Sequence, residues 1–378
     1  MPLSYNGTTS LTNVIYNGIT VNKVIFNGST VYTKEFGKET NISPLSVSRC
    51  RGAGAATVGN YAIFAGGRTR SYNSSCTPMV DVYDNSLVHT IPPSVLNSGR
   101  DTEAITIGGR GFFFGFDSAT SKHVTDIYDQ YLTHSTATGV KVYPSFEVAT
   151  VGDYIIIFED HHEGPGSALT DSSQLYIYSS SLTRINPTLS YEQYTTSRTA
   201  VSFSNYAMFA GGTYQTPSMS YPCDSDDVII FDSSLTMSEV TLSSARESIG
   251  TATIGNYALF AGGRYHYEPT AGANGWSYLR VVDALDSSLT KVYVSDLKCA
   301  NSSLCGTNSG GHAIFVGGQY LPNQLYTYDT SLTQTYKDGW VTMNRKRKCS
   351  SATNLGCYAL FAGGDGIDTT DVVEVFSS

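Results

Sequence analysis

The chain has 378 residues and a formal net charge of −9, from 23 Lys and Arg against 32 Asp and Glu. This acidic balance argues against broad binding to nucleic acids or to anionic membranes. The 27 Tyr and 16 Phe suit a strand-rich protein that packs aromatic faces.

Residues 1–36 carry a short repeat of their own. An aromatic residue followed by Asn-Gly recurs at positions 5–7, 16–18 and 26–28, within alternating apolar stretches. This pattern is a strong hairpin signal, but two or three small hairpins cannot bury a core. We therefore predict a β-hairpin segment over 1–36 that serves docking or oligomerisation. Since no basic stretch followed by an apolar one opens the chain, and no run of 18 apolar residues occurs in it, we expect no secretory signal and no membrane insertion.

From residue 37 onward a longer repeat dominates. The sequence Gly-Asn-Tyr-Ala-Leu-Phe-Ala-Gly-Gly, complete at 255–263, recurs with changes in seven copies spaced 44 to 55 residues apart. The copies begin at Gly59, Gly108, Gly152, Ser204, Gly255, Gly310 and Gly356. A period near fifty with an apolar strand that ends in a glycine pair indicates one four-stranded propeller blade per repeat. Residues 37–378 are thus predicted to form an all-β, seven-bladed β-propeller.

A second marker gives the strand order within a blade. An aromatic or apolar residue, usually followed by Asp, precedes Ser-Leu-Thr or a variant, as at Tyr83-Asp84. Asp and Ser bond nearby backbone amides, so this is tight-turn chemistry. We name the strands a to d from the central channel outward. Gly59-Asn60 is then the a–b turn, 61–65 is strand b, 80–83 is strand c, and 84–86 is the c–d turn.

Repeat length varies almost only in the b–c loop. The distance from a turn marker to the first residue of the next repeat is 24 to 28 residues. The distance from the first residue of a repeat to its own turn marker, which includes the b–c loop, is 18 to 30 residues. Because successive strands alternate in direction, b–c and d–a connections leave on one face of the ring. Loops that vary on a constant scaffold usually carry recognition. We predict that this face binds the ligand.

The N-terminal part of the propeller is predicted to close the ring. The last repeat ends at 376–378, before any strand d. Residues 39–45 resemble the strand d stretch at 88–94. We expect a strand shortly after Lys34 to complete the seventh blade and remove the free edges.

The repeats resemble kelch motifs in the glycine pair, the Tyr-Asp marker, and an Arg shortly before strand a, which we assign to Arg51, Arg100, Arg198 and Arg246. The resemblance covers about nine-tenths of the chain and implies a kelch-repeat propeller, although the strand d tryptophan typical of kelch is mostly absent. The repeats in 1–36 resemble those at the ends of phage tail-associated proteins, which implies docking to phage structural proteins.

The longest b–c loop, 264–279, concentrates aromatic residues. Candidate ligand-binding residues there are Tyr265, His266, Tyr267, Trp276 and Tyr278, and Tyr214, Tyr221 and Tyr320 lie in equivalent loops. Exposed aromatic side chains stack on sugar rings or anchor a protein partner. The alternative is that they fold over one another and cover the end of the blade.

The four arginines named above and the basic run 345–348 are predicted on the same face. Together they would form a positive patch for carboxylates or acidic peptides. The alternative is that each Arg pairs inside its own blade.

We predict no metal and no cofactor. The run Asp160-His161-His162-Glu163 is adjacent in sequence, and adjacent side chains rarely converge on one ion. No paired-histidine copper site, sialidase-type turn or phosphate-binding glycine loop is present. The seven cysteines show no C-x-x-C pair, so we expect free thiols in a reducing compartment.

Two classes of function follow. The leading hypothesis is a non-catalytic binding propeller of a phage tail or receptor-binding apparatus, located in the virion, which contacts a glycan or surface protein. The alternative is an enzyme that acts on a sugar or sugar acid at the channel mouth through the arginines and His162 or Glu163. A cytoplasmic kelch adaptor is a third possibility, which differs in the role of 1–36.

Overall fold

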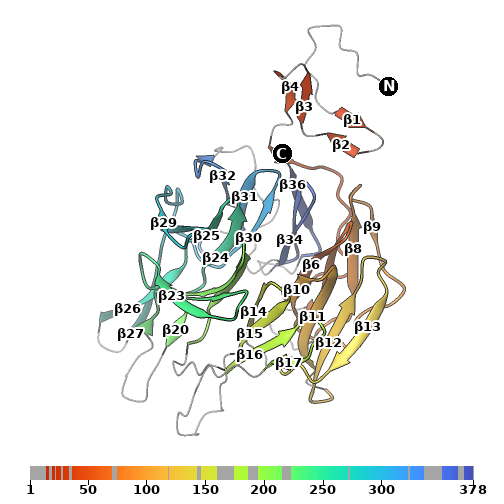
Figure 1. The fold of residues 1–378 in the computed structure, drawn as a ribbon, viewed down its shortest axis with the longest axis horizontal. Helices are drawn as coiled ribbons and strands as arrows, with labels where there is room; N and C mark the ends of the chain where they lie inside the picture. Colours follow the sequence, from red (N-terminus) through yellow and green to blue (C-terminus); the bar gives the residue numbers. More distant parts are fainter. Residues whose placement is uncertain are drawn as a thin grey trace.

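The computed structural model describes residues 36–69, 75–117, 119–142, 146–159, 174–185, 195–214, 223–270, 273–321, 324–335, 351–364 and 370–377, with the backbone of 14–16, 19–21, 23–26 and 29–33. Seven four-stranded antiparallel sheets stand as blades around a ring (Figure 1). The predicted seven-bladed propeller is therefore confirmed. Among the described residues, no helix is long and apolar enough to span a membrane.

The first four blades follow the chain from residue 51. Blade 1 contains β6 (Arg51–Val58), β7 (Tyr61–Arg68), β8 (Val80–Asp84) and β9 (His89–Thr90). Blade 2 contains β10 (Glu103–Ile107), β11 (Arg110–Asp117), β12 (Lys122–Tyr128) and β13 (His134–Thr138). Blade 3 contains β14 (Phe146–Val151), β15 (Tyr154–Glu159), β16 (Gln174–Ser179) and β17 (Arg184–Ile185). Blade 4 contains β18 (Thr199–Phe203), β19 (Tyr206–Ala210), β22 (Asp227–Asp232) and β23 (Met237–Thr241).

The last three blades complete the circle. Blade 5 contains β24 (Gly250–Ile254), β25 (Tyr257–Ala261), β28 (Val282–Asp286) and β29 (Lys291–Val292). Blade 6 contains β30 (Leu304–Ser309), β31 (His312–Gly317), β32 (Leu325–Asp329) and β33 (Gln334–Thr335). Blade 7 contains β34 (Ser351–Leu355), β35 (Tyr358–Ala362), β36 (Val373–Ser377) and β5 (Gly37–Lys38). The innermost strands contact one another in the order β6, β10, β14, β18, β24, β30, β34 and back to β6, so the ring is closed.

The closing strand comes from the N-terminal side, as predicted. In β5, Lys38 pairs with Phe376 of β36, and Lys38 Nζ forms an ion pair with the buried carboxylate of Glu374. The strand lies shortly after Lys34, as expected, and just before the stretch 39–45 that resembles strand d of blade 1. Residues after β5 cover the gap between blades 7 and 1, where Leu45 is buried and the Leu45 amide donates to the Asp371 carbonyl at 2.8 Å.

Strand b is an unbroken apolar run because each blade is packed between two others. In β7, Phe64 packs toward blade 7 against Leu360, whereas Ile63 packs toward blade 2 against Phe113. All four side chains are fully buried. Full burial of such a side chain contributes about 1.5–3 kcal/mol, so the stability of the ring lies mainly in these contacts between blades.

The c–d turns have the predicted aspartate chemistry. In blade 2, Asp129 Oδ1 accepts hydrogen bonds from the backbone amides of Tyr131 and Thr133, both at 2.9 Å. Asp84, Asp232, Asp286 and Asp329 accept the equivalent pairs in their blades. The leucine three positions after the Asp adopts positive φ, 61° at Leu132, a conformation uncommon for a side chain of this size. Packing of this leucine against the blade stabilises the turn.

The N-terminal segment forms two hairpins, which Figure 1 places outside the ring, beyond the end of β36. The first pairs β1 (Val14–Tyr16) with β2 (Ile19–Val21), and the second pairs β3 (Lys23–Phe26) with β4 (Ser29–Thr33). They flank the second and third Asn-Gly pairs, so the sequence signal is confirmed at both places. The first Asn-Gly pair, at 6–7, lies outside the described residues.

Candidate functional site

Within each blade, the described strands direct the b–c and d–a connections to the same face of the ring. In blade 1, Arg51 at the start of strand a pairs with Arg68 at the end of strand b, and Val80 at the start of strand c lies beside Ala65. The d–a and b–c connections therefore leave the blade together, and we call the surface that they form the b–c face. In blades 4 and 5 the b–c connection folds into a hairpin of its own. These hairpins pair β20 (Thr213–Tyr214) with β21 (Cys223–Asp224) and β26 (Arg264–Thr270) with β27 (Ala273–Tyr278).

The hairpin β26–β27 separates the predicted aromatic residues onto two sides. Alternation along β26 places Tyr265 and Tyr267 on the outer side, 36% and 45% exposed, with their ring centroids 6.4 Å apart. On the other side the rings of His266 and Trp276 are 3.6 Å apart, and the Arg264 guanidinium lies 3.7 Å from the Trp276 ring. The outer tyrosines are available to a partner, whereas Trp276 packs within the protein.

Polar contacts hold the inner side of this hairpin to the ring. Arg264 forms an ion pair with Glu247 at 2.7 Å and donates to Gln319 Oε1 at 3.2 Å. The His266 amide donates to Asp224 Oδ2 at 2.6 Å, and His266 Nδ1 lies 3.1 Å from Asp224 Oδ1. Tethering at both blades 4 and 6 gives the exposed tyrosines a rigid support.

Two further predicted aromatic residues extend the surface toward blade 6. Tyr278 stacks on Tyr320, with centroids 5.1 Å apart and an angle of 25° between the rings, and Tyr320 is 60% exposed. Tyr214 on β20 is half-buried and lies opposite Cys223. Tyr221 lies outside the described residues.

The residues that position the hairpin, Arg264, Glu247, Asp224 and Gln319, are not among the candidates predicted from the sequence. A signal was present for the first two, because Arg68 also follows a glycine pair and forms an ion pair with Asp101 at 2.7 Å. Asp101 and Glu247 each follow the Arg that precedes strand a. For Asp224 and Gln319 the sequence offered no comparable repeat.

A cavity of about 310 Å³ lies beside the hairpins, and we call it the rim cavity. Its lining is Cys223, Asp224, Ser244, Ala245, Tyr265 and His266. The Asp224 side chain is only 6% exposed, whereas Cys223 is exposed.

The structure places the predicted arginines mostly inside the blades. Arg100 and Arg246 are buried, and each forms an ion pair with an aspartate of strand c, Asp126 and Asp283 respectively. Burial lowers the pKa of Arg246, and the Asp283 carboxylate opposes that shift. These two guanidinium groups are directed into their own blades.

The other two arginines differ from each other. Arg198 is buried, donates to Thr195 Oγ1 at 3.0 Å and lies 5.8 Å from the Phe158 ring. Arg51 is the first residue of β6 and is exposed. The residue equivalent to Arg100 is Arg49, which is buried and pairs with Asp81. The arginine that precedes strand a in blade 1 is therefore Arg49 and not, as predicted, Arg51, because Arg51 already lies on the strand.

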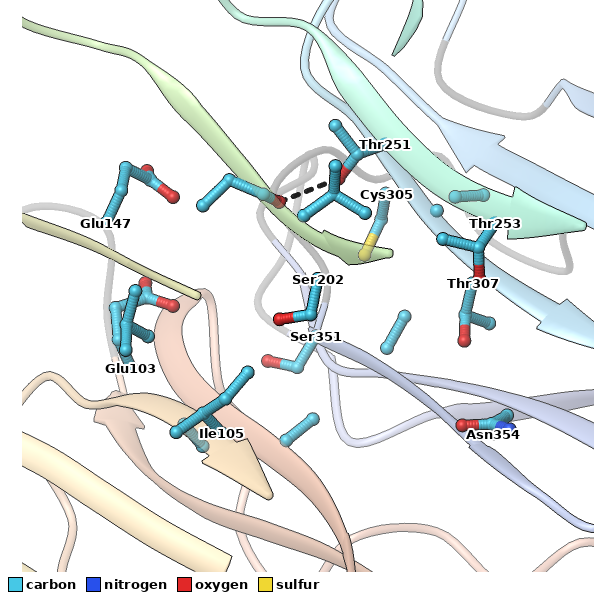
Figure 2. Close-up of a pocket in the computed structure, with 18 of the residues that line it drawn as sticks. Glu103, Ile105, Glu147, Ser202, Thr251, Thr253, Cys305, Thr307, Ser351 and Asn354 are labelled. Atoms are coloured by element: carbon cyan, nitrogen blue, oxygen red, sulfur yellow. Dashed lines mark hydrogen bonds between the residues drawn. The ribbon is translucent and has the colours of Figure 1, made fainter. Parts of the chain in front are cut away.

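The central channel, bounded by the innermost strands, holds a cavity of about 510 Å³ (Figure 2). Hydroxyl groups link neighbouring inner strands around it. Thr106 Oγ1 donates to the Thr57 carbonyl at 2.8 Å, and Thr251 Oγ1 donates to the Ala200 carbonyl at 3.2 Å. These bonds explain why the inner strands are rich in Ser and Thr.

Two carboxylates point into the channel cavity from neighbouring strands, Glu103 of β10 and Glu147 of β14 (Figure 2). Glu103 is the first residue of β10 and is exposed to the solvent of the channel. Partial desolvation by the surrounding blades, reinforced by the Asp101 charge, raises the pKa of Glu103 to about 7.

Among the described residues, no group of three or more His, Cys, Asp or Glu side chains has an arrangement that could hold a metal ion. The acidic and histidine run 160–163 and the basic run 345–348 lie outside the part of the chain that the structure describes. No protein-family model matches the chain, and no curated protein matches it at a significant level.

Proposed function

We propose that this propeller is a non-catalytic binding protein that contacts a glycan or a surface protein through its b–c face. The observation that carries the proposal is the set of exposed tyrosines, Tyr265, Tyr267 and Tyr320, on a hairpin and a loop that ion pairs and hydrogen bonds hold in place. Tyrosine supplies a large contact area at a low cost in conformational entropy. Pre-organised support lowers the ordering cost of binding further.

The setting that we propose is a phage tail or a similar particle. The hairpin segment 1–36 would attach the propeller to phage structural proteins, and the b–c face would meet the host surface. The kelch-like character of the repeats is part of the same proposal. The Arg–Asp pairs of blades 1, 2 and 5, repeated at equivalent positions, support it.

A host-cell or receptor binding assay tests the proposal. The variant Tyr267→Ala/Tyr320→Ala removes two exposed rings and should weaken binding at least about tenfold, since hot-spot tyrosines typically contribute more than about 1–2 kcal/mol each. Tyr131→Ala is the matched control, because Tyr131 is 78% exposed but lies in a c–d turn on the opposite face. Equal loss in the control, or no loss in the double variant, would contradict the proposal. Trp276 is unsuitable for this test because it packs against His266 and Arg264.

A separate comparison tests the docking role. Removal of residues 1–34 keeps Phe36, whose ring lies 6.2 Å from that of Phe376. The truncated protein should retain ligand binding and lose incorporation into the particle. If the protein were instead a cytoplasmic adaptor that belongs to no particle, the truncated protein would still bind all of its partners.

The second candidate is an enzyme that acts on a sugar at the channel mouth. The observation that favours it is the pair Glu103 and Glu147 in one cavity, with the pKa of Glu103 raised to about 7, as suits a general acid. Release of sugar from a polysaccharide that stops in Glu103→Gln would support this candidate. Retained release in Glu103→Gln would exclude this carboxylate as the acid.

A further inference from the structure

The rim cavity has the two surfaces that a sugar ring requires. Tyr265 contributes an aromatic side chain to the lining, and Ala245 adds a small apolar surface. Such surfaces pack against the apolar face of a pyranose. The cavity volume of about 310 Å³ lies at the lower end of the usual range for ligand pockets, about 300–1,000 Å³. It therefore suits a terminal residue of a glycan better than a long segment of one.

The polar wall is an acceptor. Asp224 is nine-tenths buried and accepts from the His266 amide at 2.6 Å, with His266 Nδ1 3.1 Å from its other oxygen. An ionised carboxylate has about four acceptor positions, so two remain for hydroxyl donors. Ser244 adds a hydroxyl group to the lining. Carboxylate acceptors of fixed position are suited to sugar hydroxyl groups, which are donors.

The charge of the lining selects among sugars. None of the six lining residues is Lys or Arg, and Asp224 is negative. An acidic sugar would place its own carboxylate beside Asp224, and like charges in a partly desolvated site repel. The one lining residue that can become cationic, His266, already contacts Asp224. The nearest guanidinium along β26, that of Arg264, is engaged by Glu247 at 2.7 Å.

We propose that the rim cavity binds one uncharged terminal sugar residue, with Tyr265 as the stacking platform and Asp224 as the acceptor for its hydroxyl groups. This inference rests on the proposed function, because it specifies the ligand of the b–c face. It excludes sialic and uronic acids as ligands of this cavity.

A glycan array probed with the full chain tests the ligand class. Neutral-terminated glycans should bind, and sialylated or uronic acid-terminated glycans should not. Tyr265→Ala should weaken binding about tenfold, whereas Tyr265→Phe should stay within about twofold, because stacking needs the ring and not the hydroxyl group. Tyr131→Ala should bind as the wild type does.

Cysteine protection locates the bound sugar. Cys223 lines the rim cavity and Cys305 lines the channel cavity, so each cavity carries its own reporter. With the best neutral glycan of the array at saturation, alkylation of Cys223 by N-ethylmaleimide should slow at least about fivefold, and alkylation of Cys305 should not change. Peptide mass spectrometry separates the two sites.

Selective binding of acidic glycans, protection of Cys305 in place of Cys223, or equal binding by Tyr265→Ala would each overturn the inference. Absence of any neutral glycan ligand would overturn it as well. If cell binding that depends on Tyr267 and Tyr320 persists in that case, the partner is a protein, and the proposed function survives. If neither glycans nor cells bind through the b–c face, both proposals fail.

Discussion

Loss of the Asp126 carboxylate should destabilise blade 2 far more than loss of a half-buried acid in the same blade. Asp126 is fully buried and pairs with Arg100, whose side chain is 1% exposed. The other contacts to this carboxylate come from His134 Nε2 at 2.6 Å, the Asn97 amide at 3.2 Å and Thr136 Oγ1 at 3.2 Å. Asp126→Ala removes the partner of all four groups at once.

The size of the effect follows from the charge that is left behind. Removal of one member of a buried ion pair typically costs about 3–5 kcal/mol, because the other charge stays buried without compensation. We expect Asp126→Ala to fall in this range. Asp129→Ala is the matched comparison, since Asp129 is only half-buried and its hydrogen bonds go to Tyr131 and Thr133 of its own c–d turn. The loss there should be clearly smaller.

Urea unfolding followed by near-ultraviolet circular dichroism and by intrinsic fluorescence measures both variants, and coincident transitions justify a two-state treatment. The double variant Arg100→Ala/Asp126→Ala should lose less stability than the sum of the single losses, because the groups are directly coupled. Additive losses, or equal losses for Asp126→Ala and Asp129→Ala, would refute the view that this pair is a buried unit.

Three further outcomes are expected. The pKa of Glu103 is raised from 4.5 to about 7 in the folded protein. Between these two pH values the folded state holds a proton that the unfolded chain has lost, so the free energy of unfolding falls as pH rises through this range. Glu103→Gln should therefore be more stable than the wild type at pH 8 and about equal to it at pH 4, by urea unfolding, with a gain of no more than about 1 kcal/mol given the solvent in the channel. At Leu332, where φ is 60°, Leu332→Gly should be more stable than Leu332→Ala by about 1 kcal/mol, the reverse of the usual order, and a normal order would contradict the turn geometry. Removal of residues 1–38 deletes β5 and should lower the thermal unfolding temperature, whereas removal of residues 1–34 should leave that temperature unchanged.

The ring was predictable because its main signals are local and repeat. A buried strand b must be apolar on both sides, and the backbone amides of the turn after strand c need hydrogen-bond acceptors. The same two sequence markers therefore recur in each blade. The strand that closes blade 7 was predictable only approximately. Its pairing brings together Lys38 and Glu374, which are 336 residues apart, and no local sequence pattern indicates such a contact.

The candidate site was predictable in composition and not in arrangement. The aromatic content of 264–279 indicated a surface, but strand alternation within the hairpin decides which rings are exposed, and a stretch predicted as a loop carries no such alternation. Trp276 shows the consequence. Its size made it a strong candidate, yet cation–π contact with Arg264 and packing on His266 assign it to the support of the hairpin.

The repeated residues and the inserted residues of the b–c face have different tasks. The arginines that recur before strand a form ion pairs inside the blades, as Arg100 does with Asp126 and Arg246 does with Asp283. Under the proposed function, recognition on this face would then come from what does not repeat, namely the hairpins of blades 4 and 5 and the loop of Tyr320. On that proposal, ligand preference can change by replacement of these insertions while the contacts between blades, which stabilise the ring, stay the same.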